Sequence, residues 1–584
     1  MKNSTAPALS ASFPFLIRIP ALTVAIPDHR PPSEIFTPKL VSALREGYGL
    51  QAFRKDALAG LTVAIVALPL SMAIAIASHV GPERGLYTAI IGGFIVSALG
   101  GSRFQIGGPA GAFIVLMANT VDLYGAGGLV TATLMAGVII FLIGALKLGT
   151  YIKYVPHPVT VGFTSGIAVI IFASQIKELL GLGLGGPEPA ALIPKLTALW
   201  AALPSLNPAA AGVALASLIV IAALRRWRPH WPGFLIAVAA ASIAVQVLGL
   251  NAETIATRFG GIPRSLPLPA LPDGLSLARL VTLLPTAIAI AMLGSIESLL
   301  SAVVADSMSG RRHRSNMELV AQGIANCASA LFGGIAVTGT IARTATNVRA
   351  GAHGPVSGML HALFILLVML LAAPLAGYIP LAALAAILAM VAWNMAEKAE
   401  FKNLLTASHG EAAVLLVTFV LTTFRDLSQG IMAGVALGSL IFMHRMAQSI
   451  EVKDASLPNS GGDDADRFEE ALVTDPDIAV QRISGAFFFG AVSTVVATLE
   501  RIGRPRKGYI IDVALVPFVD YSAAHSLLGF ARQAARHGLL LYVTGASERL
   551  RRDLMRYGLD APLVHYGNSI AECAAIIHQS RAGD

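Results

Sequence analysis

The most restrictive feature of the sequence is an apolar run, residues 281–304, that contains a single formal charge, the carboxylate of Glu297. Twenty helical residues rise about 30 Å, the thickness of the hydrocarbon core, so the run predicts a transmembrane helix. An ionised carboxylate at that depth costs at least ~2.5 kcal/mol, and intramembrane acids usually face a pathway for protons, ions or substrates. Gly294, Ser301 and Val304 share the helical face of Glu297, so this mostly small face suits a packed or water-lined interior. The alternative interpretation is an inert hydrogen bond from a permanently protonated Glu297.

The composition extends the membrane interpretation to most of the chain. Of 584 residues, 55% are hydrophobic and 13% are charged, whereas soluble proteins have about 25% charged residues. The 42 Lys and Arg outnumber the 34 Asp and Glu, but the basic residues cluster in short loops, which indicates topology determinants and argues against nucleic-acid binding. Cys327 and Cys573 predict neither a disulfide framework nor a cysteine metal site. No metal or other cofactor is expected.

Apolar segments between residues 56 and 445 predict fourteen membrane segments, of which the third and tenth are too short to cross the bilayer. With a cytoplasmic amino terminus, every loop on the cytoplasmic side carries Lys or Arg, as the positive-inside rule requires. Both termini are therefore expected in the cytoplasm. The predicted segments are 57–80, 86–100, 109–121, 128–146, 159–177, 210–224, 233–248, 281–305, 317–332, 342–350, 358–371, 381–392, 412–424 and 429–444.

The two short segments begin in a similar way. Paired glycines precede Pro109, and a proline in the first helical turn marks a helix start. A helix over 109–121 rises only about 20 Å, so its start is expected near the bilayer midplane, after extended chain. In the second case Gly339 interrupts the chain, and Thr340 is the candidate N-cap.

The third and tenth positions are equivalent in two halves of seven segments, which would have opposite orientations in the membrane. The expected fold class is therefore a polytopic α-helical membrane protein built as a 7+7 inverted repeat. Interrupted helices at matching positions of two halves point to the binding site of a transporter.

The chemistry of this arrangement favours an anion. Two helix amino termini at the midplane would offer unpaired N–H groups and two positive dipole ends of roughly +0.5 charge each. Arg343 lies in the first turn of the second short helix, where its guanidinium adds positive charge and suits an oxyanion. A structural ion pair with Glu297 is the alternative role of Arg343. The two roles are compatible, because a carrier could use the pair to exchange a proton for the charge of an anion.

The composition changes on both sides of the membrane segments. We expect a partly disordered cytoplasmic extension at 1–52, a membrane domain at 53–448, a linker at 449–475 and a small α/β domain at 476–584. An apolar stretch at 13–26 is broken by Arg18 and Pro20 and does not have the pattern of a signal peptide. The chain has no Walker-type loop, so nothing supports an ATP-driven pump. In the last domain the patterns predict strands at 478–483, 486–489, 509–516 and 539–543, and helices at 491–502 and 522–537.

Several segments resemble the SulP sulfate-permease family of anion carriers, which is related to prestin. The resemblance covers nearly everything from residue 53 to about 577, and the tail is similar to a STAS domain, with VPFVDYSA at 516–523 in place of the usual Asp-Ser/Thr-Gly turn. The matching segments are DALAGLTVA at 56–64 with Pro69, QIGGPAGA at 105–112, IESLLSAVVAD at 296–306, QGIAN at 322–326 with FGG at 332–334, and TGTIARTATNVRAG at 338–351.

Membership of this family would imply core and gate subdomains, a homodimer and elevator-like alternating access. It would also make Glu297 the eighth-helix acid that couples transport to protons, with Pro109, Ser301, Gly339 and Thr340 supporting the site. The residues implied to bind the substrate are Ile74 on the first helix, Ala110 and Gly111 at the start of the third, and Ala342, Arg343 and Thr344 at the start of the tenth.

Four positions depart from the family pattern. Sodium-dependent bicarbonate members carry a second acid where this chain has Leu293, so the resemblance favours protons over sodium. Ala342 stands where several relatives have Ser. Ser522 matches the phosphorylated Ser of related anti-sigma antagonists, but its neighbours Tyr521 and Ala523 differ from that turn, so phosphorylation of Ser522 is not expected.

The sequence thus predicts a proton-coupled anion symporter of a bacterial inner membrane, not an enzyme. Sulfate is the first candidate substrate, and C4-dicarboxylate or bicarbonate are alternatives. An uncoupled anion channel and a STAS-linked membrane sensor are alternatives of other classes. The expected partners are a small anion, protons, the lipid bilayer, a second copy of the chain and a cytosolic partner of the STAS domain, with no nucleic acid.

Overall fold

The computed structural model describes residues 35–152, 155–186, 188–189, 191–228, 231–272, 275–425, 427–454, 478–500 and 507–579. The chain divides into two compact units. One unit comprises Met1–Tyr154, Ile171–Ala190 and Lys195–Val391, and the other comprises Val155–Ile170, Ala191–Pro194 and Ala392–Asp584.

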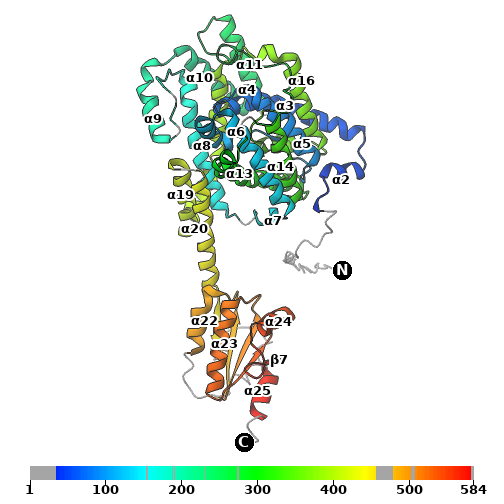
Figure 1. The fold of residues 1–584 in the computed structure, drawn as a ribbon, viewed down its shortest axis with the longest axis vertical. Coiled ribbons are helices and arrows are strands. Elements are labelled where there is room, and N and C mark those ends of the chain that lie inside the picture. Colours follow the sequence, from blue (N-terminus) through cyan, green and yellow to red (C-terminus); the bar gives the residue numbers. More distant parts are fainter. Residues whose placement is uncertain are drawn as a thin grey trace, which may run out of the picture. The chain divides into compact units, whose positions relative to one another are not determined.

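Each of the fourteen predicted membrane segments falls on helical structure (Figure 1). Eight of the described helices are long and apolar enough to cross a membrane. The membrane segments, in chain order, are α3 (Leu50–Ala77); α4 (Pro82–Tyr87) with a π-helical turn (Thr88–Gly92) and α5 (Gly93–Leu99); a 3-10 turn (Gly111–Phe113) with α6 (Ile114–Ala145); α8 (His157–Leu180); α10 (Pro208–Trp227); α11 (Gly233–Val247); α13 (Leu277–Ser309); α14 (Ser315–Leu331); α15 (Ile341–Arg349); α16 (Val356–Ala376); α17 (Leu381–Met395); α19 (His409–Phe424); and α20 (Leu427–Gln448).

Helix α6 contains both the third and the fourth predicted segments, which meet at Gly125. Gly125 has φ 71° and ψ 174°, so the chain leaves the helical conformation there. Glycine adopts positive φ without steric cost, which is why the two stretches can join at this residue. The short helices outside the membrane segments are α2 (Lys39–Arg45), which precedes the first of them, and α7 (Gly149–Ile152), α9 (Leu192–Ala201), α12 (Ile255–Phe259) and α18 (Lys398–Ala407), which lie between them.

Two extended segments interrupt the helices of the first unit. β1 (Gly107–Gly108) pairs antiparallel with β2 (Thr338–Gly339), so that Gly107 lies opposite Gly339 and Gly108 opposite Thr338. β1 leads into the 3-10 turn before α6, and β2 leads into α15. The prediction that extended chain precedes both short helices is therefore confirmed.

The prediction that Pro109 opens the third segment is wrong. Ala110 is still extended, with φ −119° and ψ 146°, and the helical turn begins at Gly111. Pro109 lies in the lead-in before this turn, and its carbonyl accepts a hydrogen bond from Nη2 of Arg343. The fixed φ of proline suits extended chain as well as a helix start.

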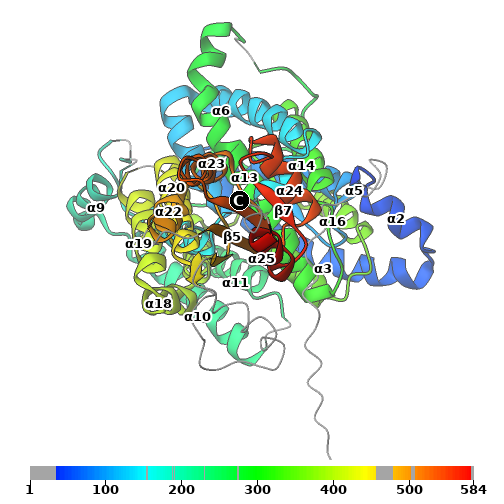
Figure 2. The ribbon, with the colours of Figure 1, turned by 90° about the horizontal axis from the view of Figure 1, so that it is seen from below.

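Helices α6 and α14 make the most extensive helix–helix contact among the described residues of the first unit (Figures 1 and 2). A Cβ atom on Gly137 would lie 2.7 Å from the backbone nitrogen of Cys327, and one on Gly323 would lie 2.5 Å from the backbone nitrogen of Phe141. The two glycines therefore allow the backbones to touch. Small residues at such contacts are typical of membrane helices, where close packing drives association.

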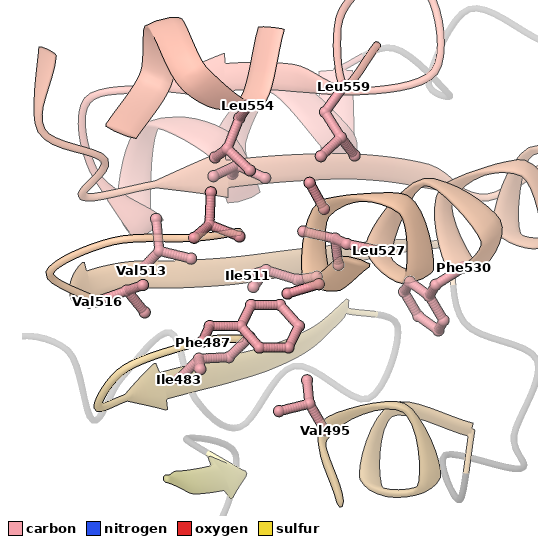
Figure 3. Close-up of a cluster of buried hydrophobic side chains, with 14 of the residues drawn as sticks. Ile483, Phe487, Val495, Ile511, Val513, Val516, Leu527, Phe530, Leu554 and Leu559 are labelled. Atoms are coloured by element: carbon pink, nitrogen blue, oxygen red, sulfur yellow. The ribbon is translucent and has the colours of Figure 1, made fainter. Parts of the chain in front are cut away.

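The carboxyl-terminal α/β domain has one five-stranded sheet in the order β3-β4-β5-β6-β7, in which β3 is antiparallel to β4 and the other pairs are parallel. One face packs against α23, where Leu527 lies beside Ile511 of β5 (Figure 3). The ring of Phe530 packs edge-on against Tyr509 of the same strand. The strands are β3 (Glu451–Asp454), β4 (Ile478–Ser484), β5 (Gly508–Leu515), β6 (Leu540–Thr544) and β7 (His565–Gly567), and the helices are α22 (Val492–Glu500), α23 (Tyr521–Arg536), α24 (Glu548–Arg556) and α25 (Ile570–Gln579).

Two sequence predictions for this region need correction. The predicted strand at 486–489 is absent from the described sheet, because Phe487 forms only an isolated bridge with Val519 and a 3-10 turn begins at Phe489. The sheet also starts earlier than residue 476, since β3 lies inside the segment predicted as a linker. Residues 1–34 of the predicted extension and 455–477 of the predicted linker lie outside the described residues.

The close α6–α14 contact predicts that a side chain added at one of its glycines will lower the stability of the protein. Gly323→Ala should destabilise the protein by ~1–3 kcal/mol, because the new methyl overlaps the backbone of α6 and forces the helices apart. Gly212→Ala in α10 is the control, since nothing lies within 4 Å of its Cβ position. Thermal unfolding in detergent measures the stability of both purified variants, and equal unfolding midpoints for Gly323→Ala and Gly212→Ala would contradict the packing argument.

Candidate anion site

The starts of the two short helices are joined by backbone and side-chain hydrogen bonds. The backbone N–H of Thr340 donates to the carbonyl of Ile106 (3.0 Å), and the N–H of Ile106 donates to Oγ1 of Thr344 (3.1 Å). The first turn of α15 is thereby attached to the chain that leads into β1. Because β1 and β2 are antiparallel, the two helix starts follow opposite ends of this short pair.

Thr340 occupies the predicted N-cap position of α15, but its hydroxyl does not cap the helix. Its Oγ1 donates instead to the carbonyl of Ile106 at 3.3 Å. Ala110, which precedes the first helical turn of the third segment, makes no side-chain cap either. Both helix starts therefore present amino-terminal N–H groups without the side-chain acceptors that usually satisfy them.

Arg343 connects the two short helices from inside the protein. Its side chain is buried, and its Nη2 donates to the carbonyl of Pro109 (3.1 Å) and to Oγ of Ser71 on α3 (3.2 Å). A Cβ atom on Gly108 would overlap Nη1 of Arg343, so the guanidinium lies directly against the backbone of Gly108. Nε and Nη1 are buried without a hydrogen-bond partner among the described residues.

Glu297 is half-buried on α13, and its Oε2 is a buried atom with no hydrogen-bond partner in the described part of the chain. Glu297 and Arg343 interact electrostatically. Both residues are described, and no direct ion pair joins them, so Glu297 and Arg343 do not form the contact ion pair considered from the sequence. An isolated carboxylate with an unpartnered oxygen is free to bind and release a proton.

The helical face that carries Glu297 packs onto the short elements, as its small residues predict. Oγ of Ser301 donates to Oγ1 of Thr344 (3.1 Å), and Oγ1 of Thr338 donates to the carbonyl of Gly294 (3.1 Å). Helix α13 is therefore bonded to both β2 and α15.

The other residues implied by the resemblance differ in exposure. Ile74, Ala110 and Thr344 are buried, whereas Gly111 is half-buried and Ala342 is exposed. All of them belong to α3 or to the two short-helix starts.

Sequence reasoning missed a set of buried polar residues around the site. Glu318 on α14, Asn347 on α15 and His361 on α16 are all buried, and His361 lies close enough to Arg343 to interact electrostatically. Glu318 stands at the edge of a predicted segment, where an acid is usually a solvated end residue. The sequence feature that could have indicated a buried Glu318 is Gln322, one helical turn later, because the two side chains can form a hydrogen bond on the same face of a helix.

A helical membrane domain with two paired, interrupted helices, followed by an α/β domain, defines a membrane transporter. The model of the Sulfate permease family matches residues 53–418, and the model of the STAS domain matches residues 471–573. The chain belongs to the sulfate permease family. It is thus an anion transporter in a membrane and not an enzyme.

Individual relatives support the same assignment. The chain is 40% identical over 516 residues to the "Putative sulfate transporter YvdB" of Bacillus subtilis (strain 168), covering 88% of this chain and 95% of that one. It is 32% identical over 520 residues to the "Bicarbonate transporter BicA" of Synechocystis sp., covering 85% and 89%.

A solved structure confirms the predicted fold class. The murine anion transporter Slc26a9 in the inward-facing state superimposes with a TM-score of 0.82 over 99% of this chain and 100% of that chain. At 17% sequence identity, this likeness concerns the fold alone.

The hydrogen bonds of Thr344 predict a measurable stability effect. Thr344→Val keeps the shape of the side chain but leaves the buried N–H of Ile106 unpaired, which should cost ~1–3 kcal/mol. Thr346→Val is the matched control, because its hydroxyl bonds only within its own helix at an exposed position. Thermal unfolding in detergent compares them, and a Thr344→Val midpoint equal to that of the control would refute the role of Thr344.

Proposed function

We propose that the protein is a proton-coupled symporter of an inorganic or small organic anion, with sulfate as the first candidate. The single observation that carries the proposal is the β1–β2 pairing, which brings two uncapped helix starts together beside Arg343 and Glu297. Uncapped helix amino termini attract anions through their N–H groups and dipoles. A buried guanidinium behind them adds positive charge where screening by water is weak.

Coupling to protons follows from the charge balance of this site. When Glu297 is ionised, its negative charge opposes the field of Arg343 and of the helix dipoles. When Glu297 binds a proton, the site becomes net positive and its affinity for an anion rises. By linkage, a bound anion raises the affinity of Glu297 for a proton by the same factor, so the two bind together.

Elevator-like alternating access is supported by the way the site elements are bonded to one another. Hydrogen bonds join β2 and α15 to α13, and Arg343 joins α15 to α3. These elements would move as one body that carries the site, as expected of a transporter built on repeats. We infer further that the chain acts as a homodimer in a bacterial inner membrane, with both termini in the cytoplasm.

Bicarbonate is the second candidate substrate, because one relative at 32% identity bears the name of a bicarbonate transporter. A C4-dicarboxylate is the third, because an uncapped helix start binds a carboxylate group as readily as it binds sulfate. Uptake of radiolabelled sulfate, bicarbonate, succinate and fumarate into proteoliposomes, with and without a pH gradient, separates these candidates. Uptake of none of the four would refute the proposed substrate class.

Removal of the buried guanidinium of Arg343 should strongly reduce transport. Arg343→Ala deletes a charge and the bonds to Pro109 and Ser71, and uptake should fall at least ~30-fold, the effect of truncating one member of a buried charged interaction. Arg349→Ala, at the exposed end of the same helix, should transport normally. Wild-type uptake by a folded Arg343→Ala protein would exclude a role for Arg343.

Removal of the titratable acid should uncouple transport from protons. Glu297→Gln keeps the size of the side chain and mimics the protonated state, so anion binding should be at least as tight as in the wild type while the response to a pH gradient disappears. Initial uptake rates with and without an inward proton gradient measure this. Glu253→Gln, at a well-exposed acid, should retain the full response. Undiminished acceleration in Glu297→Gln would overturn the coupling role.

A further inference from the structure

Glu318 is a second acid inside the membrane domain, and its surroundings are unlike those of Glu297. Its side chain is fully buried on α14. Oε1 accepts hydrogen bonds from Nε2 of Gln105 (2.8 Å) and Nε2 of Gln322 (3.1 Å), and Oε2 accepts one from the backbone N–H of Ser102 (2.9 Å). All three partners donate and none accepts, which is the pattern of a carboxylate that carries no proton.

The amide of Gln105 is oriented by this carboxylate. Its Nε2 donates one hydrogen to Glu318 and the other to Oγ of Ser298 (2.8 Å). If the amide were reversed, its oxygen would face the carboxylate oxygen, and the two would repel each other. A carboxylate offers only acceptors, so it selects one orientation of the amide.

The oriented amide lies against the two structures that form the anion site. A Cβ atom on Gly339 of β2 would overlap the amide of Gln105, so β2 is in direct contact with it. Gln105 also comes directly before Ile106, which accepts the hydrogen bond from Thr340 at the start of α15. Its other partner, Ser298, is the neighbour of Glu297 on α13.

We propose that Glu318 is a positioning residue of the transporter, which acts through the amide of Gln105 to align β2, the start of α15 and the segment of α13 that carries Glu297. The inference rests on the proposed anion transport for its kinetic consequence, but its structural part can be tested independently. Glu318 itself does not contact the anion. Its charge holds the site in the arrangement that binds the anion.

The sharpest test exchanges the two side chains. Glu318→Gln keeps the size but removes the acceptor-only group, so the amide of Gln105 is no longer restricted to one orientation. Gln105→Glu places two carboxylates at hydrogen-bond distance. The double variant Gln105→Glu with Glu318→Gln restores a matched pair, since the amide introduced at position 318 would donate to the carboxylate introduced at position 105. The hydroxyl of Ser298 would donate its hydrogen to the same carboxylate.

The kinetic readout is uptake of radiolabelled sulfate, with radiolabelled bicarbonate in parallel, into proteoliposomes. Glu318→Gln should raise KM at least ~10-fold with kcat within ~3-fold of wild type, because misalignment weakens binding by about the strength of one charged hydrogen bond. Gln105→Glu should raise KM more than Glu318→Gln does, and the KM of the double variant should return to within ~3-fold of wild type. Glu253→Gln is the control for the loss of a carboxylate at an exposed position.

The structural readout is hydrogen–deuterium exchange at the amides of Gly339 and Thr340 in the purified protein. Exchange should be slow in the wild type, faster in Glu318→Gln and slow again in the double variant. This measurement needs no transport, so a wild type that takes up none of sulfate, bicarbonate, succinate and fumarate would refute the proposed function and leave exchange to decide the role of Glu318. If Glu318→Gln does not fold, the double variant alone decides.

Two results would overturn the inference. One is a folded Glu318→Gln protein with unchanged KM and unchanged exchange at β2. The other is a folded double variant that keeps the defects of the single variants, because a purely structural role of Glu318 on α14 would not be rescued by moving the charge to residue 105.

Discussion

The central constraint on this protein is that extended backbone at the depth of a membrane must have every polar group satisfied by the protein itself. β1 and β2 are two residues long, so their own pairing satisfies only part of this requirement. Side chains complete it: Asn326 exchanges hydrogen bonds with both backbone groups of Val337, and Asn347 donates to the carbonyl of Phe104. Because these bonds come from α14 and α15, the extended pair cannot form without the helices around it, and the anion site exists only as part of that packed body.

Two acids of the membrane domain, Glu297 and Glu318, have identical side chains but different surroundings, which suit them to different roles. Glu318 has three donors and no ion-pair partner among the described residues, which suits a permanent charge in a fixed position. Glu297 has an unpartnered oxygen and lies in the field of Arg343, which suits a group that gains and loses a proton. The first arrangement gives rigidity, and the second gives a site whose charge can change during a transport cycle. The proposed proton-coupled carrier would use both, since its site must be well aligned and must also respond to protons.

Local pattern was sufficient where a structure depends on short stretches of chain. The apolar runs predicted all fourteen membrane segments, and glycines predicted the interruptions before α6 and α15. Pattern failed where a distant group decides the conformation. The helical turn starts only at Gly111, with the carbonyl of Pro109 bonded to Arg343, and the hydroxyl of Thr340 bonds to Ile106 rather than capping α15. Glu318 was not identified because its partners, Ser102 and Gln105, are more than two hundred residues away along the chain.

The sequence by itself determined the class of protein, the number of membrane segments, the two interrupted helices and the candidate roles of Glu297 and Arg343. These properties follow from apolar length, glycine and proline placement and rare intramembrane charge, which are local and visible in one chain. Only the tertiary structure decided that the two interruptions pair as strands, that Arg343 bonds to Pro109 and not to Glu297, and that Glu318 is bonded to Gln105. The physical reason is that buried hydrogen bonds between distant segments depend on which helices pack together, and helix packing is a property of the whole fold.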